Sequence, residues 1–181
     1  MKKRLFIAID LPKDIKEHIK VLEKEIDRKF GQKLFWINEE NLHLTLLFLG
    51  YIDEQKIDEI VKLLNGLSKP EPFQLKINQL KYGPDERVKR MIWLIFEESK
   101  ELQEFQQSIE CILEKGNIPF HKEHRPYLPH INLIRFKEKI YKPPIQKDLN
   151  FEFKVESFIL KESVLKRSGA EYRDVALFSL S

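Results

Sequence analysis

One strand pattern occurs twice in this chain, at residues 43 and 130, and any fold must accommodate both copies. The first copy is His43-Leu-Thr45-Leu within NLHLTLLFLG, and the second is His130-Ile-Asn132-Leu within RPYLPHINLIRF. Successive strand side chains point to opposite faces, so each histidine shares a face with the polar residue two positions later. The copies lie too far apart for one hairpin, so only the tertiary fold could bring them together.

Helical patterns separate the strand patterns. Apolar residues recur at three- and four-residue steps in residues 13–30, 53–67 and 99–116, which predicts three amphipathic helices. Asp53 and Ser99 are the expected N-caps of the second and third helices, and Gly116 is the expected stop of the third. Strands are expected at residues 4–10, 33–37, 42–49, 73–80, 90–97, 130–136, 151–160 and 174–180.

The order of these elements also repeats. A helix ending near Phe30 precedes His43, and a helix ending near Gly116 precedes His130, each with an extended segment between them. This repetition predicts an α+β fold in which residues 1–181 form one bilobed domain. Each lobe is expected to be an antiparallel sheet with helices outside. Two such pseudo-symmetric lobes would place the histidines on opposite walls of a cleft.

Composition is that of an ordinary globular protein, with 42% hydrophobic and 34% charged residues. No apolar run reaches the roughly 18 residues of a membrane span, and a single cysteine, Cys111, favours a reducing cytoplasm. The net charge of +3 permits a nucleic-acid partner without requiring one. Basic residues gather at 81–90 and 161–173, which are expected to be loops. We expect a monomer, because no apolar stripe is left over.

Two imidazoles facing one another suit a reaction that removes one proton and delivers another, because imidazole titrates near neutral pH. In-line attack on a phosphodiester needs a base and an acid on opposite sides of phosphorus. Thr45 and Asn132 could then donate hydrogen bonds to the non-bridging oxygens. The structural alternative is that each histidine is a core residue satisfied by a neighbour.

A metal site is a further alternative, since His121, Glu123, His124 and His130 lie close together in sequence. Their spacing matches no usual zinc pattern, and cysteine ligands are missing. A Walker-type glycine loop and a dinucleotide-binding fingerprint are also missing from the sequence. We therefore expect no metal and no cofactor.

With both motifs and their flanks, the chain resembles the two-histidine phosphoesterase superfamily, and within it the bacterial and archaeal RNA 2′,3′-cyclic phosphodiesterases, also called 2′-5′ RNA ligase-like proteins. The resemblance covers nearly the whole chain, including RLFIAIDLP at the start and ESVLKRSGAEYRDVALFSL at the end. It implies metal-independent opening of a 2′,3′-cyclic phosphate on RNA to a 2′-phosphate. It also implies the reverse-type reaction, which joins the cyclic phosphate to a 5′-hydroxyl and forms a 2′-5′ bond.

The resemblance assigns roles to the repeated motif. His43 would be the proton donor to the leaving 3′ oxygen, and His130 the proton acceptor that activates water. Thr45 matches the phosphate-binding hydroxyl of the first motif. Asn132 stands where the family has threonine, and its amide still offers an N–H donor.

Arg125 and Arg135 flank the second motif and are candidate substrate contacts, although strict alternation would place Arg135 on the face opposite His130. The implied partner is RNA with a 2′,3′-cyclic phosphate end, with tRNA-derived ends among the candidates. Two alternatives stay open. One is a small cyclic nucleotide as substrate, and the other is an RNA-binding module whose catalysis is weakened by Asn132.

Overall fold

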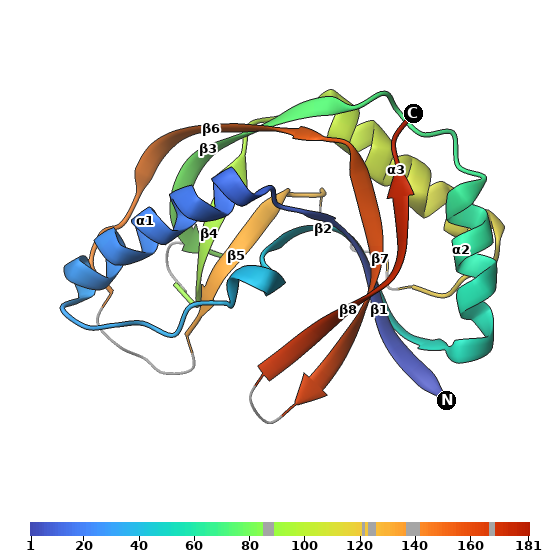
Figure 1. Cartoon of the computed structure of the whole chain (residues 1–181), viewed down its shortest axis with the longest axis horizontal. Helices are drawn as coiled ribbons and strands as arrows, with labels where there is room; N and C mark the ends of the chain where they lie inside the picture. The colour runs from blue at the N-terminus through green and yellow to red at the C-terminus, as the bar shows by residue number, and fades with distance from the viewer. Residues whose placement is uncertain (85–88, 121, 123–125, 137–141, 167–168) are drawn as a thin grey trace.

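Two four-stranded antiparallel sheets and three helices make up the structure, a computed structural model, and the predicted α+β class is confirmed (Figure 1). It describes residues 1–84, 89–120, 122, 126–136, 142–166 and 169–181. The first sheet has the strand order β2-β1-β7-β8, and the second has the order β5-β4-β3-β6.

The first sheet contains β1 (Lys2–Asp10), β2 (His43–Asp53), β7 (Ser157–Lys166) and β8 (Gly169–Ser179). The second contains β3 (Phe73–Gly83), β4 (Met91–Phe96), β5 (His130–Arg135) and β6 (Lys147–Val155). The helices are α1 (Lys13–Phe30), α2 (Ile57–Asn65) and α3 (Lys100–Lys115), and short 3-10 turns occupy Glu39–Asn41 and Glu54–Lys56. Each motif histidine is therefore the first residue of its strand, one in each sheet.

Helices α1 and α3 each pack against the sheet that does not contain the strands they connect. Helix α1 connects two strands of the first sheet but lies against β6 of the second (Figure 1). There His18 stacks on Phe151, with ring centroids 4.7 Å apart. Helix α3 connects two strands of the second sheet but lies against β2 of the first. Phe105 of α3 meets Phe158 of β7 edge to face, at 5.1 Å between centroids. Each sheet is thus covered by a helix from the other sheet's part of the chain.

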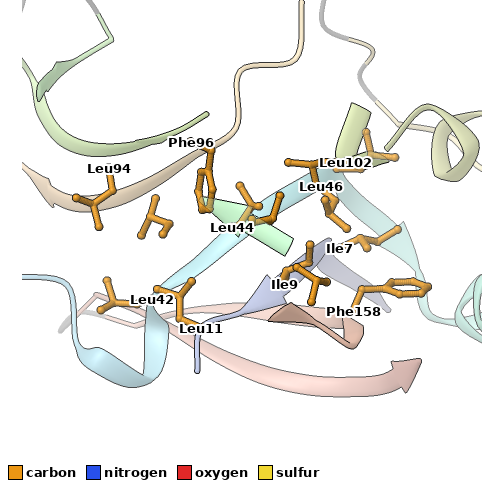
Figure 2. Packing of buried hydrophobic residues seen from close by; sticks show 14 of the residues in the cluster. Ile7, Ile9, Leu11, Leu42, Leu44, Leu46, Leu94, Phe96, Leu102 and Phe158 are labelled. Carbon is orange, nitrogen blue, oxygen red and sulfur yellow. The ribbon is translucent and has the colours of Figure 1, made fainter. Parts of the chain in front are cut away.

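One hydrophobic cluster joins both sheets and the helices. Leu42, Leu44 and Leu46 point into it, as Figure 2 shows, and none is more than 2% exposed. The residues that alternate with them, His43 and Thr45, are partly exposed. The predicted alternation along the first motif is therefore confirmed, because one face of β2 is buried in the core and the other is not.

The prediction of a strand at residues 33–37 was wrong, because these residues form no strand. The Asp27 carboxylate holds this segment in an irregular path, with Oδ1 accepting from the Leu34 N–H at 2.9 Å and from Trp36 Nε1 at 3.0 Å. A backbone hydrogen bond from Ile37 N to Leu133 O, 2.9 Å long, ties its end to β5. A side-chain acceptor has here taken the place of a strand partner.

Two of the three predicted helix boundary residues are confirmed, and one is wrong. The Ser99 hydroxyl accepts from the Leu102 N–H at 3.1 Å, and Gly116 follows the last residue of α3, so both predictions are confirmed. Strand β2, however, continues through Asp53, and a 3-10 turn separates Asp53 from α2. Asp53 makes no side-chain capping bond, so its predicted role was wrong.

The predicted strand at residues 151–160 is two strands in different sheets. Strand β6 ends at Val155 and β7 begins at Ser157. Buried residues alternate up to Val155, but the next one, Phe158, comes three positions later, so the alternation changes phase at Glu156. The break lets the chain leave one sheet and enter the other.

In the described part of the chain, every helix is too short or too polar to cross a membrane.

Candidate active site

His43 lies at the start of β2, partly buried, with its ring oriented by the backbone. Its Nδ1 is 2.7 Å from the Asn41 carbonyl oxygen. A carbonyl can only accept, so Nδ1 carries the proton and donates it in this hydrogen bond. The other ring nitrogen, Nε2, is then the atom that gains or loses a proton.

His130 repeats this arrangement at the start of β5. Its Nδ1 lies 2.9 Å from the Leu128 carbonyl oxygen, again two residues earlier. Strands β2 and β5 contact one another across the two sheets, and the charge of His130 acts on His43. The fold therefore brings together two imidazoles with the same tautomer, each with Nε2 as its titrating atom.

Thr45 and Asn132 lie on the same strand faces as the histidines, as predicted. Ile131 and Leu133, which alternate with His130 and Asn132, are fully buried. The Tyr127 hydroxyl donates to the Thr45 carbonyl oxygen at 2.8 Å, which ties the segment before β5 to the first motif.

Aromatic rings pack around both imidazoles. The His43 ring has Phe6 at 4.9 Å and Tyr172 edge-on at 5.1 Å between centroids. The His130 ring lies against Trp93, with centroids 4.0 Å apart. These contacts limit the orientations open to each imidazole, so Nε2 is held in a restricted position.

Burial lowers the pKa of His43 and is the largest influence on it. The Asn41 carbonyl and the Asp10 carboxylate favour the charged imidazole, while Lys161 and His130 disfavour it. The pKa of His43 lies below its usual value as the net result. An anionic ligand beside the ring would favour the protonated form and raise that pKa.

We therefore predict two NMR titration results for His43. In the free protein its midpoint will lie below about 6.5, the usual value for histidine. Adding inorganic phosphate will move the midpoint upward. The signal can be assigned by its loss in His43→Gln. A midpoint at or above the usual value in the free protein would show that burial does not control this imidazole.

Asn132 and Trp93 are cross-strand partners that both carry an unsatisfied buried atom. Asn132 Oδ1 and Trp93 Nε1 are buried and have no hydrogen-bond partner among the described residues. Leaving a buried polar atom unpaired costs stability, so such atoms commonly indicate a functional position. Asn132, which stands where the resembled family has threonine, is thus also a residue whose buried side-chain oxygen has no hydrogen-bond partner among the described residues.

Gly83 provides the space in which the Trp93 ring lies. A Cβ added at Gly83 would overlap that ring. We predict that Gly83→Ala lowers the free energy of unfolding by about 1–3 kcal/mol, as overpacking usually does. It will also lower activity, because the displaced ring supports His130. Chemical denaturation and kcat measure the two effects.

Gly66→Ala is the matched control for this change, since a Cβ there meets backbone atoms no closer than 3.6 Å. We expect Gly66→Ala to leave activity unchanged. Equal effects of the two substitutions would contradict the close approach at Gly83.

Arg135 lies on the same face as His130, and the expectation from strict alternation was wrong. Trp93 pairs with Asn132 but Ile92 pairs with Ile134, so Leu133 is an extra residue that forms a β-bulge. The bulge reverses the alternation, and Arg135 pairs with Met91, which shares the face of Trp93. The charge of Arg135 accordingly reaches Tyr172 beside His43.

A corresponding bulge follows the first motif. Ala8 pairs with Thr45 and Ile7 with Leu47, which leaves Leu46 unpaired and returns Phe48 to the face of His43. Phe48 is 40% exposed, and the Arg4 guanidinium lies over its ring at 4.6 Å. The sequence pattern did not predict Phe48 as part of the site, because a bulge carries no period-two signal.

Other predicted groups fall elsewhere. Arg125, His121, Glu123 and His124 lie outside the described residues, and the described part of the chain holds no group of three or more metal-ligating side chains. The basic segment 161–173 is a hairpin of β7 and β8 instead of a loop, apart from 167–168, which lie outside the described residues. Lys161 is buried in that hairpin, so its assignment to a solvated loop was wrong.

Tyr172 and Tyr127 were also missed as parts of the site. Tyr172 belongs to the C-terminal segment that carries the family resemblance, which was the available signal. Tyr127 precedes His130 by three residues, but no local pattern shows that its hydroxyl reaches β2.

Known proteins are similar to this chain in sequence and in fold. The family described as LigT like Phosphoesterase matches residues 9–93. A Methanocaldococcus jannaschii protein named RNA 2′,3′-cyclic phosphodiesterase is 34% identical, with 93% of this chain and 96% of that protein covered. A Thermotoga maritima protein of the same name is 32% identical, with coverages of 94% and 91%.

Solved structures agree. The crystal structure of a Thermus thermophilus protein, TT0787, has a TM-score of 0.85 at 27% identity, covering 98% of this chain and 97% of that one. E. coli LigT complexed with 3′-AMP, at 24% identity and a TM-score of 0.79, covers 100% and 99% and shares the fold. The chain therefore belongs to the LigT-like phosphoesterase family and is an enzyme of the phosphoesterase class.

Proposed function

We propose that this protein hydrolyses RNA 2′,3′-cyclic phosphate ends to 2′-phosphates without a metal ion. The observation that carries the proposal is the matched pair of imidazoles on β2 and β5. Each donates Nδ1–H to a carbonyl two residues earlier, so Nε2 is the atom through which each can exchange a proton with a substrate. The shared name of the curated relatives supports RNA as the substrate class.

The proton transfers follow from the role of each imidazole. His130 Nε2 takes a proton from water as the water oxygen bonds to phosphorus. The bond from phosphorus to the 3′ oxygen breaks on the opposite side, and His43 Nε2 gives its proton to that oxygen. The product has a 2′-phosphate and a 3′-hydroxyl, and proton exchange with solvent returns both histidines to their starting states.

The phosphate contacts come from the same two faces. Thr45 and Asn132 are proposed to donate hydrogen bonds to the non-bridging oxygens, and Arg135 to place its charge beside them. Arg125 is kept as a further proposed contact from the sequence. Phe48 offers an exposed ring on which a nucleobase could stack.

The deciding experiment uses an RNA that ends in a 2′,3′-cyclic phosphate, in excess EDTA, beside a His130→Ala control. We expect the wild type alone to form a 2′-phosphate. Formation of a 3′-phosphate would reverse the assignment of the leaving oxygen. Activity that depends on added metal would overturn the metal-free mechanism.

The same groups could run the reverse-type reaction, in which a 5′-hydroxyl of RNA replaces water. We propose that 2′-5′ ligation occurs at this site when such an end is supplied, in a cytoplasmic setting. Incubating cyclic-phosphate RNA with 5′-hydroxyl RNA and mapping the linkage tests this. A 3′-5′ linkage, or no joined product at high RNA concentration, would contradict it.

An RNA-binding module with weakened catalysis is the second candidate, favoured by the unsatisfied Asn132 Oδ1. We predict that Asn132→Thr raises kcat by less than about tenfold, because the asparagine amide already supplies one donor. Steady-state kinetics on the RNA substrate measure the change. Activity that appears only in Asn132→Thr would favour the binding module.

A small cyclic nucleotide is the remaining alternative. Three cations of the basic segment 161–173 are engaged within the protein, since Lys161 binds Asp10 and Asp174 while Lys166 and Arg173 bind Glu171. Comparing kcat/KM for a cyclic mononucleotide and a cyclic-ended oligonucleotide decides the matter. We expect the oligonucleotide to be better by roughly tenfold or more, because remote contacts add transition-state binding.

A further inference from the structure

A lysine is buried on the sheet face that carries His43. Lys161 of β7 is 5% exposed, and its Nζ lies 3.0 Å from Asp10 Oδ2 and 2.6 Å from Asp174 Oδ1. Burial lowers the pKa of Lys161, but the bonds to Asp174 and Asp10 outweigh burial and hold that pKa above its usual value. The lysine is therefore charged, and the cluster of two carboxylates and one ammonium carries one net negative charge.

Strand pairing in the first sheet places this cluster next to His43. Lys161 pairs with Asp174 across β7 and β8 and with Phe6 across β7 and β1. Asp10 pairs with His43 across β1 and β2. Directly opposed residues of antiparallel strands share a face, with Cβ atoms about 5 Å apart. The cluster thus ends on the residue directly opposite the His43 side chain.

Stability alone gives little reason for such a cluster. Lys161 is the buried partner, whereas the Asp10 and Asp174 side chains are 38% and 62% exposed. Replacing a buried charge and its partner by apolar residues of similar volume is often neutral or stabilising. The two residues that precede Lys161 along β7, Leu160 and Ile159, are apolar and at most 7% exposed, while Glu162 and Ser163 follow it. A hydrocarbon side chain would suit this position in a purely structural sheet.

We propose that Asp10 is a positioning residue for His43, and that Lys161 and Asp174 hold its carboxylate beside the imidazole so that its charge favours the acid form. The inference rests on the proposed role of His43 as proton donor. Burial favours the neutral ring, and the Asp10 carboxylate opposes that effect, so Asp10 increases the share of His43 that carries an Nε2 proton to give.

Among the other groups acting on His43, the Asn41 carbonyl also favours the charged ring, through its hydrogen bond with Nδ1. Lys161 from β7 and His130 from β5 both disfavour a charged His43. Tyr172 from β8 presents a ring edge, and the Asn41 carbonyl engages Nδ1. Among the groups acting on His43, Asp10 is the carboxylate.

The test compares Asp10→Asn with Asp174→Asn. Each substitution removes one carboxylate partner of Lys161, so both should disturb the cluster to a similar extent. Only Asp10 lies opposite His43. We expect Asp10→Asn to move the NMR titration midpoint of His43 to lower pH, and Asp174→Asn to move it less than half as far. Asp10→Glu, which keeps the carboxylate, should largely restore the midpoint.

The direction of the shift separates electrostatics from damage. A substitution that merely loosened the site would admit water to His43 and move its midpoint up, toward the usual value. An upward shift in Asp10→Asn, or equal shifts in both variants, would overturn the proposal. Should Asp10→Asn fail to fold, Asp10→Glu against Asp10→Gln gives the same comparison between a charged and a neutral side chain.

Kinetics then connect the cluster to the reaction. We expect kcat/KM of Asp10→Asn on the cyclic-ended RNA to fall about three- to tenfold, and more as the pH rises, since less His43 carries a proton. The NMR result is independent of turnover. If Asp10→Asn leaves the His43 midpoint unchanged while the wild type turns over normally, the cluster's role alone is refuted. If Asp10→Asn shifts the midpoint as expected but the wild type shows no turnover on this RNA, the proposed function alone is refuted.

Discussion

His130→Ala and His43→Ala are each expected to lower kcat by about 10²–10⁴-fold on RNA with a 2′,3′-cyclic phosphate end. Each substitution removes one of the two proton transfers and leaves the phosphate contacts in place. The reaction then depends on water to supply or accept the missing proton. Single-turnover assays at saturating enzyme measure the chemical step directly.

The double variant makes this test sharper. Two residues that act as one unit are not additive, so removing both should cost little more than removing one. His18→Ala is the control. His18 lies on helix α1, where it stacks on Phe151 of β6, and it has no part in the site. A loss of less than tenfold in either single variant, or fully multiplicative losses in the double variant, would contradict the paired mechanism.

The pH profile of kcat/KM should be bell-shaped, and its two limbs belong to the histidine pair as a unit. Each single variant would lose the bell shape. The profile therefore provides an additional way to recognise coupled imidazoles without assigning either limb to one residue.

Thr45→Val is expected to lower kcat by about 10²–10³-fold, the usual cost of losing one donor to a developing oxyanion. Valine has nearly the volume and shape of threonine and suits a strand. The hydrogen bond from Tyr127 goes to the Thr45 backbone carbonyl, so the substitution leaves it in place. The change thus removes the hydroxyl with little else.

Thr45→Ser serves as its control, because serine keeps the hydroxyl and should retain most of the activity. Thermal unfolding of all three proteins checks that stability is unchanged. If Thr45→Val stays within threefold of the wild type, the hydroxyl does not bind the phosphate in the transition state, and Asn132 and Arg135 must carry that role.

Sequence periodicity predicted the features that depend on burial of one face. Helix α1 begins at Lys13 and ends at Phe30 as expected, because its apolar stripe lies against the core. His43 and Thr45 share a face for the same reason. These are local consequences of a chain that must bury its apolar side chains.

The errors came where a non-local group decided the outcome. Asp27 holds residues 33–37 out of a sheet, and an extra residue at Leu133 returns Arg135 to the site. Lys161 reads as a surface cation in the sequence, but its two carboxylate partners lie on other strands. Such pairings depend on the register between strands, which a single strand's sequence does not contain.

The exchange of helices between the two sheets bears on how the chain can be divided. A fragment containing β1, α1 and β2 would expose the α1 stripe that normally meets β6, and a fragment with β4, α3 and β5 would expose Phe105, the partner of Phe158. Neither fragment has a complete core, and β6 and β7, which carry the missing partners, belong to neither of them, so we expect both fragments to stay unfolded, alone or mixed. A phosphoesterase built this way cannot lose one lobe and keep the other.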